Sequence, residues 1–281
     1  MVKPSQVTDL DWRSVLVADR PSGYGVIGDG LPVVFVHGWA LGPHSYRRAL
    51  LGLARLGCRV YAPSLPGSGP TAALPAGELS FGGVAAWLDR FLDAVGVAEP
   101  VLVVGHSFGG GVAIGFAARF PDRVLSLALI NSIGGGPWPS GSGRVRTLDD
   151  RPMWEWALRF PREVFTASGL VATVRAVAEE AVPNLLRRPG AVWRVGQLAR
   201  RGDLARQLEA LRERDAPTLV AWAAGDGIVP RGSFDALCGA LGVCGTVVPG
   251  HHAWLLADPR RFVELMAGPV AAASRRRTSA A

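Results

Sequence analysis

The chain has 281 residues, of which 49% are hydrophobic and 19% charged, a length and composition that fit one large α/β domain or two small ones and exclude an intrinsically disordered protein. Its formal net charge is +7, but the arginines are interspersed with Asp and Glu, so we predict no nucleic-acid-binding surface. The three cysteines form no C-x-x-C pair, which argues against a disulfide scaffold and predicts buried, reduced thiols.

Short apolar runs rich in β-branched residues recur along the chain and predict strands. They occupy Val33 to Val36, Arg59 to Ala62, Val101 to Val104, Leu125 to Ile130, Thr218 to Ala221 and Gly245 to Val248. Because the runs are continuous rather than alternating, we expect strands that are buried on both faces, as in a parallel sheet. Apolar residues at helical spacing predict crossover helices at Tyr46 to Leu56, Phe81 to Val95, Phe108 to Arg119 and Pro259 to Met266. This order predicts an α/β fold with a mostly parallel central sheet and helices on both faces.

The segment 137–214 interrupts the alternation of strands and helices. A loop rich in Gly, Pro and Ser leads into a stretch with helical patterning and no convincing strand, which predicts a helical cap over the sheet. The core then consists of a first part, 1–136, and a second part, 215–272. Residues 273–281 are predicted to form a flexible tail, because a run of three arginines lies there among Ser and Ala.

The strongest chemical signal is Gly105-His106-Ser107-Phe108-Gly109, a G-x-S-x-G pattern between a predicted strand and a predicted helix. In that context the pattern is typical of a nucleophile elbow, a sharp turn that lifts the serine hydroxyl out of the sheet and tolerates only small flanking residues. The backbone N–H of Phe108 then lies at a helix N-terminus, where a developing oxyanion is stabilised. We therefore predict that Ser107 is a nucleophile.

A serine hydroxyl requires a general base, and the base requires a carboxylate that orients it. Asp226 lies in a turn just past a predicted strand, where open α/β sheets place functional groups. Two adjacent histidines, His251 and His252, follow the last predicted strand and leave the identity of the base open at this point. The chain order of serine, aspartate and histidine is the one that this elbow type uses.

A second oxyanion donor is expected on the loop after the first central strand, which reads His37-Gly38-Trp39. The backbone N–H of Trp39 is the candidate. We expect His37 and His106 to be structural hydrogen-bonding residues, since neither lies at a spacing suited to a zinc site and the chain contains no H-E-x-x-H.

Taken together, these motifs are similar to those of the α/β-hydrolase fold superfamily, in the branch of esterases and C–C hydrolases that carry a helical cap. The matching positions are His37-Gly38-Trp39, Leu65 to Gly69, Gly105 to Gly109, Gly225-Asp226 with Val229-Pro230, and His252 with Asp258-Pro259. The resemblance covers nearly the whole chain outside the cap. It implies Ser107 as nucleophile, His252 as general base, Asp226 as its orienter, and the N–H groups of Trp39 and Phe108 as oxyanion donors. A serine nucleophile argues against the epoxide hydrolases and haloalkane dehalogenases, which use a carboxylate.

Two departures from the family pattern lie in the turn after the second predicted strand. Ser64 stands where the family usually has aspartate, and Gly69-Pro70 replaces the usual serine ending. We expect both to shape the edge of the sheet rather than the chemistry. In the cap, Trp154, Trp156 and Trp193, with Trp138 at its entrance, either form an apolar wall for a substrate or pack the cap onto the sheet, and we favour packing.

The resemblance implies a serine hydrolase that acts on a small-to-medium apolar carboxylic ester or thioester through an acyl-enzyme, with no metal and no organic cofactor. Two alternatives remain open: a C–C bond hydrolase of the meta-cleavage type with the same triad, and a ligand-binding protein of this fold with little turnover. The expected partner is a small apolar ester-like molecule. We expect neither nucleic acid binding nor stable membrane insertion, and a cytoplasmic location, since the N-terminus has no apolar signal region and no apolar run is long enough to span a bilayer.

Overall fold

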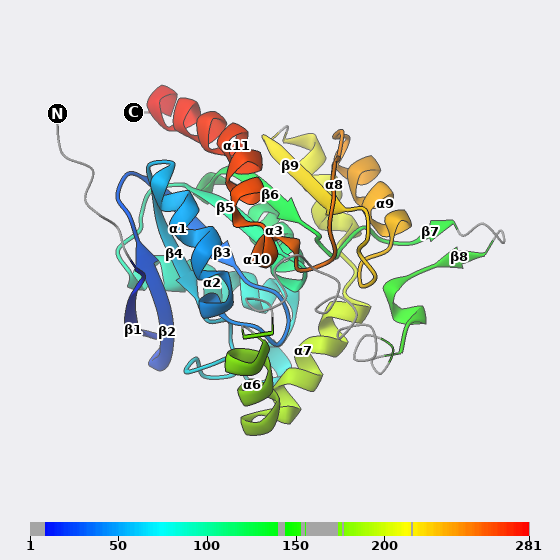
Figure 1. Ribbon diagram of the computed structural model, residues 1–281, viewed down its shortest axis with the longest axis horizontal. Coiled ribbons are helices and arrows are strands. Elements are labelled where there is room, and N and C mark those ends of the chain that lie inside the picture. The colour runs from blue at the N-terminus through cyan, green and yellow to red at the C-terminus, as the bar shows by residue number, and fades with distance from the viewer. Residues whose placement is uncertain are drawn as a thin grey trace.

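The computed structural model describes residues 9–139, 144–152, 155, 174–175, 177–214 and 216–280. An eight-stranded sheet runs through the molecule, and helices cover both of its faces (Figure 1). The strand order is β1-β2-β4-β3-β5-β6-β9-β10. β1 and β2 are antiparallel to their neighbours, whereas every pairing from β4 to β10 is parallel. The predicted α/β fold with a mostly parallel sheet is confirmed.

All six predicted strands are present. The strands of the sheet are β1 (Asp11–Val17), β2 (Arg20–Ile27), β3 (Leu31–Val36), β4 (Cys58–Pro63), β5 (Val101–His106), β6 (Val124–Ile130), β9 (Thr218–Ala223) and β10 (Thr246–Val248). The helices that cover it are α1 (Arg47–Arg55), α2 (Phe81–Ala94), α3 (Phe108–Arg119), α8 (Ala205–Glu213), α9 (Arg231–Leu241), α10 (Trp254–Ala257) and α11 (Pro259–Ala280).

Two hydrophobic cores lie on the two faces of the sheet, and β3 contributes to both. Val33 and Phe35 pack in the core that contains residues of α1 and α11, whereas Val34 and Val36 pack in the core that contains residues of α2 and α3. Successive side chains of a strand point to opposite faces, so all four are fully buried. This two-sided burial explains why the central strands are continuous apolar runs.

The hairpin of β1 and β2 was not predicted from the sequence. β1 is an edge strand with mostly exposed side chains, so it lacks the apolar run that marks the central strands. Its turn at Ala18 and Asp19 has φ of 48° and 59°, the positive values that two-residue hairpin turns require, yet it contains neither Asn nor Gly. Both usual signals of a hairpin are therefore absent from this stretch of sequence.

The prediction of a flexible tail at 273–281 differs from the structure, in which α11 continues to Ala280. Three contacts hold the end of this helix. Ala273 is fully buried, Arg276 donates a hydrogen bond to the carbonyl of Leu125 (3.2 Å), and Arg277 forms an ion pair with Glu99 (2.7 Å). Arg276 and Arg277 thus connect the end of the helix to β6 and to surface residues of the domain. Within the described part of the chain, no helix is both long enough and apolar enough to cross a membrane.

The inserted segment contains α6 (Val182–Arg187) and α7 (Pro189–Arg201), which lie together at one edge of the molecule (Figure 1). At the entrance of the segment, where the sequence shows no convincing strand, two residues of β7 (Trp138–Pro139) pair with two of β8 (Val145–Arg146). The next helix, α8, packs against α3 and α9 in the layer that covers the sheet.

The tryptophans of the inserted segment do not share one environment. Trp138 is buried, with its ring against Gly232, whereas Trp193 on α7 is 55% exposed. Trp154 and Trp156 lie outside the described residues.

Candidate active site

Ser107 occupies the turn between β5 and α3, and its backbone has φ 55° and ψ −119°. Such a positive φ is strained for a residue with a side chain, by about 1–3 kcal/mol. The turn also requires its glycines, since a Cβ on Gly105 would lie 2.4 Å from the Gly109 carbonyl oxygen and one on Gly109 would lie 2.1 Å from the Val36 carbonyl oxygen. Close packing of α3 on the sheet therefore explains the small residues on both sides of the serine.

The loop after β10 brings a histidine to this serine. His252 Nε2 lies 2.9 Å from Ser107 Oγ. His251, by contrast, hydrogen-bonds through Nδ1 to the carbonyl of Gly225 (3.0 Å). Of the two adjacent histidines, the structure places His252, the one that the family resemblance implies, against Ser107.

Asp226 lies behind the histidine, in the turn after β9, and its carboxylate is fully buried. Oδ2 lies 2.8 Å from His252 Nδ1, and Oδ1 accepts hydrogen bonds from the N–H groups of Ile228 and Val229, both at 2.8 Å. Because a carboxylate can only accept, Nδ1 of His252 carries the proton and Nε2 presents its lone pair to the Ser107 hydroxyl. Serine, histidine and aspartate form one hydrogen-bonded chain.

Asn131 is a site residue that was not predicted from the sequence. Its Nδ2 donates to Asp226 Oδ2 (2.6 Å), the oxygen that also faces His252, and its Oδ1 accepts from the indole N–H of Trp254 (2.8 Å). Asn131 directly follows β6 and has φ 45°, a conformation that Asn tolerates better than most residues. In the sequence, the only local indication of this role was that a polar residue immediately follows a buried strand.

The two expected oxyanion donors lie on different elements beside Ser107. Phe108 is the first residue of α3, where backbone N–H groups have no acceptor within the helix. Trp39 lies on the loop 38–45 that follows β3, and a Cβ on Gly38 of this loop would lie 3.4 Å from the Ser107 Cβ. The indole N–H of Trp39 donates to the carbonyl of Val192 in α7 (2.8 Å).

His37 is held entirely by backbone groups. Its Nε2 accepts from the N–H of Leu65 (2.9 Å), so Nδ1 carries the proton and donates to the carbonyl of Gly38 (2.9 Å). Burial lowers the pKa of this imidazole, which favours the neutral form. His37 thus connects the end of β3 to the turn after β4.

His106 connects the loop 38–45 to the loop after β10, which carries His252. The N–H of Gly38 donates to the Tyr46 hydroxyl (3.1 Å), which donates to His106 Nδ1 (2.8 Å), and Nε2 of His106 donates to the carbonyl oxygen of His252 (3.0 Å). Burial, with a smaller contribution from the nearby His252, lowers the pKa of His106 to about 3. A neutral ring with one donor and one acceptor is what this chain of bonds requires.

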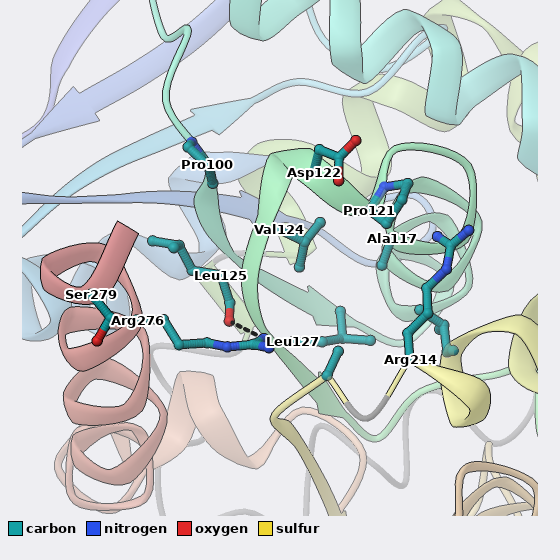
Figure 2. A pocket seen from close by; sticks show the side chains of 12 residues that line it. Pro100, Ala117, Pro121, Asp122, Val124, Leu125, Leu127, Arg214, Arg276 and Ser279 are labelled. Carbon is teal, nitrogen blue, oxygen red and sulfur yellow. Dashed lines mark hydrogen bonds between the residues drawn. The ribbon is translucent and has the colours of Figure 1, made fainter. Parts of the chain in front are cut away.

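A pocket of about 400 Å³ lies at the other end of the sheet, near the start of β6 (Figure 2). Val124, Leu125, Arg214 and Arg276 line it, and the hydrogen bond from Arg276 to the Leu125 carbonyl crosses one side. The triad residues are not among its lining residues. Ser107, Asp226 and His252 lie instead just past the carboxyl ends of β5, β9 and β10, the end of the sheet where open α/β folds bind their ligands. Across the described ranges, no group of three or more His, Cys, Asp or Glu side chains gathers as a metal site would require.

Comparisons with known proteins agree with this architecture. Residues 32–159 match the family described as alpha/beta hydrolase fold. The pimeloyl-[acyl-carrier protein] methyl ester esterase of Aromatoleum aromaticum is 30% identical over 225 residues, which cover 74% of this chain and 85% of that protein. A serine hydrolase involved in carbazole degradation superposes with a TM-score of 0.73 at 22% identity, covering 93% of this chain and 99% of the other. A meta-cleavage product hydrolase from Pseudomonas fluorescens IP01 superposes with a TM-score of 0.69 at 22% identity, covering 92% and 97%.

Proposed function

Since the chain belongs to the α/β-hydrolase fold family and is an α/β-hydrolase enzyme, we propose that it is a serine hydrolase that cleaves small-to-medium apolar carboxylic esters or thioesters. The observation that carries the proposal is the chain of hydrogen bonds from Ser107 Oγ to His252 Nε2 (2.9 Å) and from His252 Nδ1 to Asp226 Oδ2 (2.8 Å). An esterase among the relatives at 30% identity favours ester chemistry.

In the acylation step, Ser107 Oγ attacks the acyl carbon while its proton moves to His252 Nε2. The negative charge that develops on the carbonyl oxygen is stabilised by the backbone N–H groups of Phe108 and Trp39. Asp226 keeps the ring oriented and stabilises the imidazolium. The imidazolium then gives its proton to the leaving alkoxide or thiolate as the carbon–oxygen or carbon–sulfur bond breaks, which leaves an acyl ester on Ser107.

In the deacylation step, water attacks the acyl carbon and gives a proton to His252 Nε2. The tetrahedral intermediate collapses, the carboxylic acid leaves, and the proton returns to Ser107 Oγ. His252 therefore acts once as base and once as acid in each half of the cycle, so the reaction requires no group beyond those of the chain and water.

The first experiment measures hydrolysis of p-nitrophenyl esters from acetate to laurate by the wild type and by Ser107→Ala. Turnover that depends on acyl length and disappears in the variant supports the proposal. Cleavage of a 2-hydroxy-6-oxo-dienoate without turnover of any ester would instead support C–C hydrolysis. Labelling of Ser107 by a fluorophosphonate without turnover of either substrate class would support a ligand-binding protein.

A further inference from the structure

The loop 38–45, which carries the expected oxyanion donor Trp39, has little regular structure of its own. It begins two residues after Val36, the last residue of β3, contains Ala40 with φ 62°, and ends within a short 3₁₀ turn, Pro43–Tyr46. Its backbone N–H groups therefore need acceptors from elsewhere in the molecule. The N–H of Gly38 donates to the Tyr46 hydroxyl, whereas those of Gly42, His44 and Ser45 donate to a residue of the cap.

Glu180 makes most of the hydrogen bonds between the cap and the loop 38–45. It lies on a π-helical turn of the cap, Val177–Ala181, far from the loop in sequence. Its Oε2 accepts from the N–H groups of Gly42 (2.8 Å) and Ser45 (2.9 Å) and from the Ser45 hydroxyl, and its Oε1 accepts from the N–H of His44 (3.0 Å). Three converging N–H groups favour an anion, so a carboxylate is the suitable acceptor.

The absence of a side chain at Gly42 leaves space for the Glu180 carboxylate. A Cβ at residue 42 would lie 2.5 Å from Glu180 Oε1, although the backbone there is extended, with φ −150°, and accessible to any residue. The glycine therefore leaves room for the close approach of the glutamate, and a side chain here would displace the carboxylate.

A second cap residue holds the other side of the loop. Asn184 on α6 is buried, and its Nδ2 donates to the carbonyl of Ala40 (3.1 Å) and to the Ser68 hydroxyl (3.2 Å), while its Oδ1 accepts from the N–H of Gly69 (2.9 Å). Together with the bond from the Trp39 indole to α7, the cap contacts the loop at residues 39, 40, 42, 44 and 45.

We infer that Glu180 and Asn184 are positioning residues for the oxyanion hole: the cap fixes the loop that presents the Trp39 N–H to the transition state. The inference rests on the proposed function and assigns neither residue a contact with the substrate. Loss of the Glu180 carboxylate removes the acceptor of the Gly42 and His44 N–H groups and leaves the Ser45 N–H with only its 3.2 Å bond to the Gly42 carbonyl, so the loop relaxes and the donor at Trp39 loses its alignment. Stabilisation of the transition state falls, whereas the binding of the uncharged substrate is retained.

The test compares Glu180→Gln with Glu179→Gln, a matched control on the same turn whose carboxylate pairs with Arg175 at 2.6 Å. For a p-nitrophenyl ester that the wild type turns over, Glu180→Gln should lower kcat about 10- to 100-fold and change KM less than twofold, with a parallel loss of affinity for a trifluoromethyl ketone, which forms an oxyanion adduct with serine. Glu179→Gln should change none of these. Gly42→Ala, which displaces the carboxylate from the loop side, should reproduce the kinetics of Glu180→Gln.

Amide hydrogen exchange of the loop gives a readout that does not depend on activity. Exchange of the Gly42, His44 and Ser45 amides should rise in Glu180→Gln and stay at the wild-type level in Glu179→Gln. A variant that melts at a lower temperature but keeps its kcat and its ketone affinity would overturn the inference, because Glu180 would then only attach the cap. If the wild type hydrolyses no ester, the proposed function fails, and unchanged exchange in Glu180→Gln would separately refute the positioning of the loop.

Discussion

Replacing Asn131 tests how the carboxylate of the site is held. Asn131→Gly removes the 2.6 Å hydrogen bond to Asp226, a bond to a charged group that contributes about 1.5–3 kcal/mol. It also leaves the buried indole N–H of Trp254 without its acceptor, which costs about 1–3 kcal/mol. We expect the free energy of unfolding to fall by about 2.5–6 kcal/mol. Since the carboxylate keeps its two backbone donors, kcat should fall only about tenfold, less than the loss of about 10⁴ expected for Asp226→Asn.

Comparison of Asn131→Ala with Asn131→Gly separates the energetic cost of backbone strain from the cost of the lost hydrogen bonds. The alanine variant loses the same two bonds, but at φ 45° an alanine costs about 1–2 kcal/mol in strain that glycine avoids, so it should be less stable than Asn131→Gly. Trp254→Phe is the control, because it removes the indole donor and leaves the bond to Asp226 in place, and its kcat should stay close to that of the wild type.

The assay measures the free energy of unfolding in denaturant for Asn131→Gly, for Trp254→Phe and for the variant that combines the two. The kcat of each is then measured on one ester. The double-mutant cycle should show a coupling of about 0.5–3 kcal/mol between residues 131 and 254. Equal stability of the wild type and Asn131→Gly would refute the reasoning, as would an Asn131→Ala variant that is more stable than Asn131→Gly.

Three further predictions concern the same region. His252→Ala should lower kcat at least 10³-fold, whereas His251→Ala should retain most activity on the same ester, and the reverse pattern would reassign the base. Gly109→Ala places a Cβ 2.1 Å from the Val36 carbonyl oxygen, so it should yield little folded protein by circular dichroism, and a variant as stable as the wild type would contradict the packing of the elbow. The pKa of His106 is lowered to about 3 by burial, so between pH 6.5 and 3 the unfolded chain binds a proton that the folded chain does not. The free energy of unfolding should therefore fall on acidification by up to about 1.4 kcal/mol per pH unit from this residue, and His106→Gln should show a shallower dependence in acid unfolding.

Local sequence pattern was sufficient to predict the parallel strands and the sharp turn that carries Ser107. Strands that are buried on both faces must be continuous apolar runs, so β3, β5 and β6 could be located without knowledge of their neighbours. The glycines around Ser107 reflect a steric limit within a few residues of the turn. Asp226 and His252 follow strands of the sheet, and parallel strands present their carboxyl ends at one edge, so their approach to Ser107 could be predicted.

Other features depend on partners that are distant in the chain. The family resemblance implied His252 rather than His251, but the position of its ring beside Ser107 depends on the path of the loop after β10, and the folding of the C-terminal segment as helix depends on the contacts of its arginines with distant residues. Asn131 and Glu180 are unremarkable polar residues in sequence. Their importance comes from acceptors and donors about 95 and 135 residues away, which only the packed molecule brings within 3 Å. A hydrogen bond of that kind depends on the relative placement of whole elements, and this placement is decided by tertiary packing rather than by local pattern.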